Sequence, residues 1–333
     1  MHATRDVSKL LRKGTQFFAS FCLLFALLMW VSITLAPPPT PFEARLRLLM
    51  SRLDAEAITI GHSHSNAILF SALGMNGFHL FGGGMDLFET ELILKHVVPK
   101  MQRLRYVFIP IAYWSLQWDN GTLPTRQERR VSMYRSLLVA PLRGDLLLYL
   151  ESRIRGVVRT DNWEWLFHSL QGEKPRFEEL DPESGRNMSV QNVPSTRLIL
   201  NRHAEKAART HMDTSRAMAQ VHGSLEGDTE ACLVRILTFL KAREIEPIVY
   251  TPPYSQEYIS RYDDAAIHAM TRSITAVCLE LDLPYYNFSG DPEFIHDPTL
   301  FANSDHLNRT GAAAFSEKLK KAIYTRHPPE TPM

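Results

Sequence analysis

Residues 106–112 read YVFIPIA, an almost uninterrupted apolar run that follows the basic segment QRLR. A run of this kind is typical of a strand in a parallel sheet that is covered on both faces. Shorter strand patterns lie on both sides of it and alternate with helical patterns, which indicates an α/β fold with a parallel sheet. The expected strands are residues 57–60, 77–81, 106–112, 247–251 and 284–288, and the expected helices are residues 86–98, 236–243, 263–281 and 310–324.

The alternation stops between about residues 115 and 227. We predict that this stretch is a largely helical insertion that covers or extends the site, with helical fragments at residues 136–158 and 204–220. The sequence therefore predicts one α/β domain over residues 55–325 that contains the insertion, followed by a tail at residues 326–333.

The N-terminal segment has the pattern of a membrane anchor. Residues 1–16 are basic, and residues 17–36 (FFASFCLLFALLMWVSITLA) carry no charge. About twenty apolar residues span a bilayer core of roughly 30 Å, and the basic flank favours a cytoplasmic N-terminus. We expect an uncleaved single-pass helix in the inner (cytoplasmic) membrane, then a spacer with a short helix at residues 37–54, and a main domain that is periplasmic or extracellular. A cleaved signal peptide is the alternative, and it exports the main domain as well.

The composition is that of an ordinary globular protein. The chain is 45% hydrophobic and has a formal net charge of +1. A nucleic-acid-binding protein usually has a clear excess of basic residues, so the charge balance gives no support for a nucleic-acid partner.

A serine follows the first expected strand, in the segment Gly61-His62-Ser63-His64. A serine at a strand-to-helix turn is exposed, and the free N–H groups at the start of the following helix can stabilise an oxyanion. Such a serine becomes a nucleophile when a histidine lies within hydrogen-bond reach. The alternative is that Ser63 is simply the N-cap of that helix.

A second polar segment, NSDHLNRTGA at residues 303–312, lies between the last strand and the last helix. It is therefore expected at the same edge of the sheet as Ser63. His306 could serve there as the base, with a nearby carboxylate or carbonyl holding its tautomer. The alternative is a solvated loop in which Thr310 caps the last helix.

Together, the turn after the first strand and the DHLNxxGA pattern at residues 305–312 resemble the SGNH/GDSL hydrolase superfamily, in particular its membrane-anchored DltD-like branch. The resemblance covers residues 55–112 and 228–325. It implies a flavodoxin-like three-layer sandwich around the parallel sheet, with Ser63 as the nucleophile and His306 as the base.

The chain departs from the family pattern at the acid. The family's acid stands three residues before the histidine, where this chain has Asn303, and Asp305 is adjacent to His306. A neighbouring side chain normally points away, so we expect a Ser-His dyad that is assisted by Asn303 or a backbone carbonyl, with Asp305 as a further candidate catalytic residue.

The resemblance also implies a glycine and an asparagine as oxyanion donors. Gly82 and Gly83 follow the second strand and are expected to supply a backbone N–H. No GxND pattern follows the third strand, where Tyr113 or Ser115 is expected to substitute, and His64 is expected to line the same oxyanion or substrate site.

These residues predict a serine esterase or O-acyltransferase that acts on acyl groups of a cell-envelope or exported polysaccharide. Its expected partners are an acylated glycan or acyl donor, the membrane and, by the resemblance, a membrane-bound O-acyltransferase. The departures leave a second interpretation open, a catalytically degenerate glycan-binding or scaffold protein. A third interpretation, a metallohydrolase, rests on the histidines and aspartates near the site, but the sequence has no metal-binding motif, so neither a metal nor a cofactor is expected.

Overall fold

The computed structural model describes residues 12–27, 41–137, 146–147, 150, 186 and 195–326. The chain divides into two compact units, one formed by Met1–Pro39 and Ala140–Arg176 and the other by Thr40–Val139 and Phe177–Met333. In the first unit, residues 12–27 form a helix. The sheet and both segments of the predicted site lie in the second unit.

The predicted membrane anchor is only partly within the described residues, because residues 28–36 lie outside them. None of the described helices is both long and apolar enough to cross a bilayer. Most of the helix predicted at residues 136–158 also lies outside the described part of the chain.

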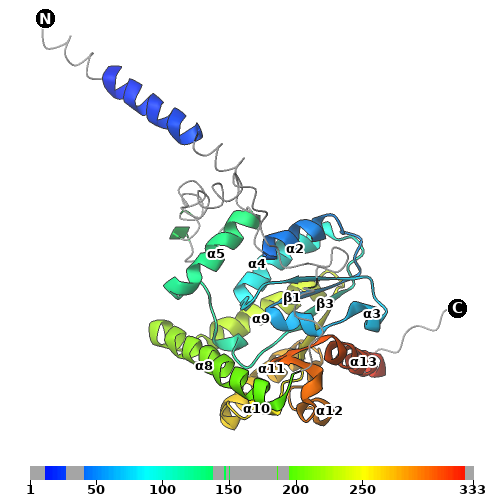
Figure 1. The fold of residues 1–333 in the computed structure, drawn as a ribbon. Helices are drawn as coiled ribbons and strands as arrows, with labels where there is room; N and C mark the ends of the chain where they lie inside the picture. The colour runs from blue at the N-terminus through cyan, green and yellow to red at the C-terminus, as the bar shows by residue number, and fades with distance from the viewer. Residues whose placement is uncertain are drawn as a thin grey trace, which may run out of the picture. The chain divides into compact units, whose positions relative to one another are not determined.

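Five parallel strands form the central sheet of the second unit (Figure 1). The order β2-β1-β3-β4-β5 confirms the predicted α/β class with a parallel sheet. The chain changes direction across the sheet beside β1, which is the kind of switch point where doubly wound sheets bind ligands. The strands are β1 Ala57–Gly61, β2 Gly77–Phe81, β3 Tyr106–Pro110, β4 Glu246–Thr251 and β5 Tyr285–Asn287.

Helices connect the strands and agree with the predicted alternation. The 3-10 turn η1 (Ser63–Ala67) follows β1 directly, and the two-stranded pair β6 (Phe301–Asn303) and β7 (His306–Leu307), which the sequence did not predict, precedes the last helix. The remaining elements are α2 Pro41–Met50, α3 Phe70–Leu73, α4 Leu87–Val97, η2 Val98–Lys100, η3 Ser115–Gln117, α5 Pro124–Leu137, α8 Arg197–His222, α9 Glu226–Lys241, α10 Gln256–Ile259, α11 Asp264–Glu280, α12 Pro292–Ile295, η4 Pro298–Leu300 and α13 Arg309–Arg326.

Helices pack on both faces of the sheet (Figure 1). On one face α4 contacts β1, α9 contacts β4, and the two helices contact each other. On the other face α13 packs against α3 and η1. Both faces of the strands are therefore apolar, which explains the nearly continuous hydrophobic runs in the sequence.

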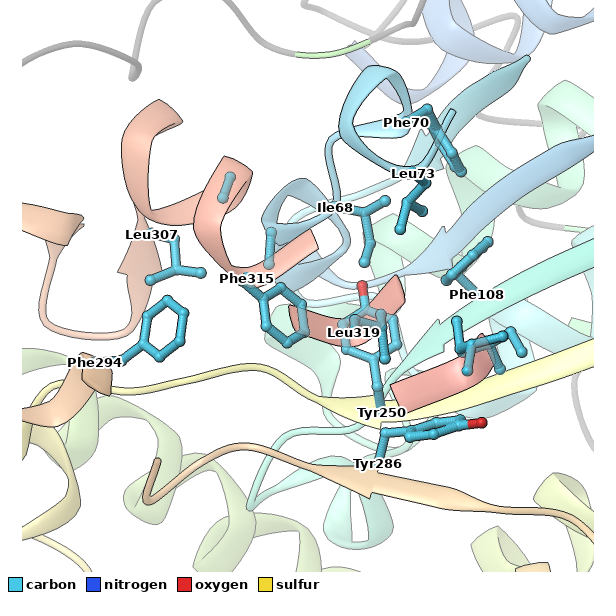
Figure 2. Close-up of a cluster of buried hydrophobic side chains, with 14 of the residues drawn as sticks. Ile68, Phe70, Leu73, Phe108, Tyr250, Tyr286, Phe294, Leu307, Phe315 and Leu319 are labelled. Carbon is cyan, nitrogen blue, oxygen red and sulfur yellow. The ribbon is translucent and has the colours of Figure 1, made fainter. Parts of the chain in front are cut away.

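Figure 2 shows the core on the α13 side of the sheet. Tyr250 of β4 packs against Phe315 of α13, with ring centroids 5.8 Å apart, and Phe108 of β3 packs against Phe70 at 5.7 Å. These four side chains are buried. Burying one such side chain stabilises the fold by about 1.5–3 kcal/mol relative to leaving it exposed. This packing fixes the start of α13, and with it the β6–β7 segment that carries His306.

The first turn of α13 explains the Asn and Gly of the DHLNRTGA segment. The Asn308 side chain accepts a hydrogen bond from the Gly311 N–H at 3.0 Å and donates to the Thr299 carbonyl at 2.6 Å. A Cβ atom at Gly311 would lie 2.1 Å from the Leu300 carbonyl oxygen, so the helix can approach η4 this closely only with glycine there. Asn308 therefore caps the helix, so the alternative in which Thr310 is the cap is wrong.

Candidate active site

Ser63 is the first residue of η1, at the carboxyl end of β1. Gly61 has φ +140, a conformation that side chains rarely adopt, and it lets the chain turn sharply out of the strand. His62 stands at the N-cap position of the turn, so the alternative that Ser63 serves as the cap is wrong. The Ser63 side chain is half-buried and is left free for another partner.

That partner is His306. The His306 Nε2 atom lies 2.7 Å from the Ser63 Oγ atom, although the two residues are 243 positions apart in the sequence. The His306 side chain is 24% exposed, so solvent still reaches the ring. A serine hydroxyl in contact with an imidazole nitrogen is the arrangement that activates serine as a nucleophile.

Asn303 and Asp305 both face the other nitrogen of the His306 ring. The His306 Nδ1 atom lies 3.0 Å from the Asn303 Oδ1 atom and 3.2 Å from the Asp305 Oδ1 atom. Of the two contacts, the one with Asn303 has hydrogen-bond geometry, so Asn303 orients the ring and Asp305 acts on it through its charge. The expectation that Asp305 points away from His306 is therefore wrong.

The backbone of the turn between β6 and β7 explains this arrangement. The Asn303 Oδ1 atom also accepts the backbone N–H groups of Asp305 at 3.2 Å and His306 at 2.9 Å. These bonds curl the chain into a tight turn with a register irregularity, whereas a neighbouring residue would point away in an extended strand. The amide and the carboxylate are thus brought to the same ring nitrogen.

His64 lies behind this group. Its Nε2 atom is 3.5 Å from the Asp305 Oδ2 atom, and its Nδ1 atom is 2.8 Å from the His62 Nδ1 atom. Both His64 and Asp305 are almost completely buried. His64 was expected to line the oxyanion or substrate site, whereas its ring is buried against Tyr254 and His306.

Burial and one carboxylate set the charges of the site. Burial favours the neutral form of His306, but the charge of Asp305 outweighs it and raises the pKa of His306 above the usual value. Burial also disfavours the charged form of Asp305, but His306 and His64 outweigh it and hold the pKa of that carboxyl well below its usual range. Burial lowers the pKa values of His62 and His64, so both rings are neutral at pH 7.

The expected oxyanion donors are only partly available. The Gly82 N–H donates to the Gly61 carbonyl at 3.1 Å and is therefore occupied. The Arg129 side chain lies over this loop and donates to the Gly83 carbonyl. By contrast, the Ser63 N–H has no acceptor within the described part of the chain, and it is the donor best placed for an oxyanion formed at Ser63.

Tyr113 is separated from the Ser63–His306 pair by the rings of Tyr254 and His64. Its ring contacts Tyr254, which in turn contacts His64, with ring centroids 5.0 Å and 5.3 Å apart. Tyr113 and Tyr262 also line a cavity of about 450 Å³ beside α8 and α11, but neither Ser63 nor His306 reaches it. Tyr113 is therefore not brought into contact with Ser63, and Ser115 contacts His62 instead, at 3.4 Å.

Two histidines of α8 that were not predicted from the sequence lie near the site. His203 contacts the Ser304 hydroxyl at 2.9 Å and lies 3.7 Å from Asp305, and His211 contacts Tyr258 at 2.7 Å. Their spacing of eight residues, about two helical turns, was the available signal that both lie on the broad inner side of one helix. Part of the predicted insertion therefore contributes directly to the site.

Three residues of the site have metal-binding side chains close together. The donor atoms of His64, Asp305 and His306 lie within 4.8 Å of one another. The two imidazole rings are nearly parallel, with 12° between their planes and 4.6 Å between their centroids. Their in-plane lone pairs do not converge on one point, so the arrangement fits a metal poorly.

No family model and no curated protein matches the chain. The function is therefore inferred from the site itself. Its main feature is a serine in contact with a histidine at the carboxyl edge of a parallel sheet, beside the switch point of the strand order.

Proposed function

We propose that this protein is an SGNH-like serine esterase or O-acyltransferase. The observation that carries the proposal is the 2.7 Å contact between the Ser63 Oγ and His306 Nε2 atoms. Asn303 orients the ring, and the Asp305 charge favours the protonated ring that forms when serine is deprotonated. The strand order β2-β1-β3-β4-β5 supports a flavodoxin-like arrangement of the sandwich.

In the proposed reaction, the Ser63 Oγ atom attacks the acyl carbonyl while His306 Nε2 takes the hydroxyl proton. The tetrahedral oxyanion is held by the Ser63 N–H. His306 then returns its proton to the departing alcohol oxygen, which leaves an acyl ester on Ser63. Water or a sugar hydroxyl next attacks this ester and passes its proton to His306, which gives hydrolysis or transfer.

The substrate class and location are further parts of the proposal. The apolar sequence at residues 17–36 supports an anchor in the inner membrane, with the catalytic domain outside the cytoplasm. A site held near the membrane surface suits acyl groups on a cell-envelope or exported polysaccharide. By resemblance, a membrane-bound O-acyltransferase is the proposed source of an acyl donor.

One observation favours a second candidate, a catalytically degenerate protein that binds glycan or organises an assembly complex. The Gly82 N–H, expected as an oxyanion donor, is occupied by the Gly61 carbonyl. Removing a single oxyanion donor costs about 10²- to 10³-fold in rate in well-studied proteases, so an incomplete set weakens catalysis strongly.

Ester hydrolysis by the detergent-solubilised full-length chain tests the proposal. We expect release of acetate from an acetylated polysaccharide, or of nitrophenol from 4-nitrophenyl acetate, and loss of that activity in Ser63→Ala. Activity equal in Ser63→Ala and wild type would contradict the serine mechanism. Activity abolished by EDTA and restored by zinc would instead favour the metallohydrolase interpretation. Glycan binding without any hydrolysis would favour the scaffold.

A further inference from the structure

Asp305 lies among three histidines that come from different parts of the chain, of which His306 and His64 are nearer than His203 of α8 at 3.7 Å. Its Oδ1 atom is 3.2 Å from His306 Nδ1, and its Oδ2 atom is 3.5 Å from His64 Nε2. The carboxylate and the His64 side chain are 3% and 2% exposed, so water contributes little to holding either group. A buried carboxylate is costly unless donors surround it, and His64 faces the oxygen that His306 leaves free.

The contacts of His64 determine which of its nitrogens carries the proton. The Asp305 carboxylate can only accept, so the facing His64 Nε2 atom must be the donor. His64 Nδ1 is then an acceptor, and His62 Nδ1 supplies the N–H across their 2.8 Å contact. The His64 backbone N–H also approaches His62 Nδ1, at 3.4 Å. This contact would need a His62 ring protonated on Nε2, and it is longer and therefore weaker than the 2.8 Å contact between the two rings.

We propose that His64 is a positioning residue of the active site, which holds the Asp305 carboxylate beside His306 through its Nε2–H, with His62 fixing the tautomer. This inference rests on the proposed serine mechanism. The role of the family's single acid is then divided in this chain. Asn303 orients the His306 ring, and Asp305, held from behind by His64, supplies the charge.

The assignment explains why two histidines flank the nucleophile. Ser63 points toward His306, while His62 and His64 on either side of it are buried and contact each other. The turn that carries the nucleophile Ser63 therefore also carries His64, which holds the Asp305 carboxylate of the β6–β7 segment. The 3.5 Å contact between His64 and Asp305 is long for a hydrogen bond, and we expect it to shorten when His306 becomes charged.

A matched pair of variants tests the role of His64. His64→Gln places an amide N–H near the position of Nε2, whereas His64→Met has a similar length without a donor and packs well against the Tyr254 ring. The full-length chain in detergent is labelled with an alkyl fluorophosphonate, and the limiting rate and half-saturating concentration of the probe are measured. We expect His64→Met to lower the limiting rate by about 10- to 100-fold with an unchanged half-saturating concentration, and His64→Gln to stay within about 3-fold of wild type.

Two outcomes would overturn the inference: a His64→Met rate equal to wild type, or a His64→Gln rate as low as that of His64→Met. A wild-type chain that is not labelled at Ser63 would instead overturn the proposed function. A second measurement needs no variant. In ¹⁵N-histidine-labelled wild-type protein, the His64 resonances should show the Nε2–H tautomer, and the Nδ1–H tautomer would contradict the inference even if His64→Met does not fold.

Discussion

Replacing Asp305 with asparagine removes a buried negative charge from beside His306 while almost preserving the shape of the side chain. The Asp305 Oδ1 atom lies 3.2 Å from the His306 Nδ1 atom. At this distance, with an effective dielectric constant of about 20, a carboxylate and an imidazolium attract by about 5 kcal/mol. Water reaches part of the ring and Asn303 keeps its hydrogen bond, so we expect a loss of about 3–4 kcal/mol, or roughly 10²- to 10³-fold in the rate of serine acylation.

The pH profile makes this prediction specific to the charge. Asp305 raises the pKa of His306 above its usual value against the effect of burial, and the base must be neutral to accept the serine proton. In Asp305→Asn burial dominates, so the pH at which activity is half-maximal should move from above about 6.5 to below it. The assay is the rate of ester hydrolysis or fluorophosphonate labelling against pH. A variant with the wild-type rate and the wild-type midpoint would refute the idea that Asp305 stabilises the imidazolium.

Three further predictions concern the same loop, the α13 junction and pH stability. In Asn303→Asp, the new carboxylate can accept the same three hydrogen bonds as the amide oxygen, so the rate of fluorophosphonate labelling should be at least that of wild type. A labelling rate more than tenfold lower would show that a second carboxylate is not tolerated beside His306. Gly311→Ala forces a Cβ atom against the Leu300 carbonyl and should lower the free energy of unfolding by about 1–3 kcal/mol in urea titrations, with an unchanged midpoint refuting the tight contact. Burial, only partly opposed by Asp305, lowers the pKa of His211 to about 4. The neutral His211 ring therefore stabilises the fold fully above about pH 6.5, and as the pH falls toward 4 the free energy of unfolding should decrease by at most about 3 kcal/mol. His211→Asn should make the free energy of unfolding less dependent on pH in this range.

The sheet could be predicted from sequence because its strands are buried on both faces. The run at residues 106–112 and its shorter counterparts leave few alternatives to a covered parallel sheet, and the helices between them have clear amphipathic patterns. The β6–β7 pair could not be predicted in the same way, because two strands this short carry no periodic signal. Their pairing depends on the turn that Asn303 stabilises.

The positions of Ser63 and His306 followed from topology. Each lies after a strand and before a helix, and the loops after parallel strands meet at one edge of the sheet. The contact between Ser63 and His306 could therefore be predicted without knowing the structure of the residues between them. The site residues that the sequence did not reveal are those whose positions depend on tertiary packing, such as His203 on α8, which reaches Ser304 from a stretch without strand alternation.

Two expectations about particular groups were wrong because they relied on local geometry alone. Asp305 was expected to point away from His306, which is true of an extended strand but not of the tight turn that is present. The Gly82 N–H was expected to be free for an oxyanion, but it donates to the Gly61 carbonyl as an extension of the β1–β2 pairing. Neither outcome is encoded in the spacing of a motif.

Covalent labelling by a fluorophosphonate tests the central claim most directly, because the reagent reacts with an activated serine whatever the natural substrate is. The full-length chain is compared with Ser63→Ala and His306→Ala between about pH 6 and 9, a range that starts below the ordinary pKa of histidine and extends in the direction in which Asp305 shifts the pKa of His306. We predict labelling of the wild type at Ser63 and none of either variant. Absence of wild-type labelling across this range, or undiminished labelling of His306→Ala, would contradict the proposal that Ser63 and His306 form a catalytic dyad.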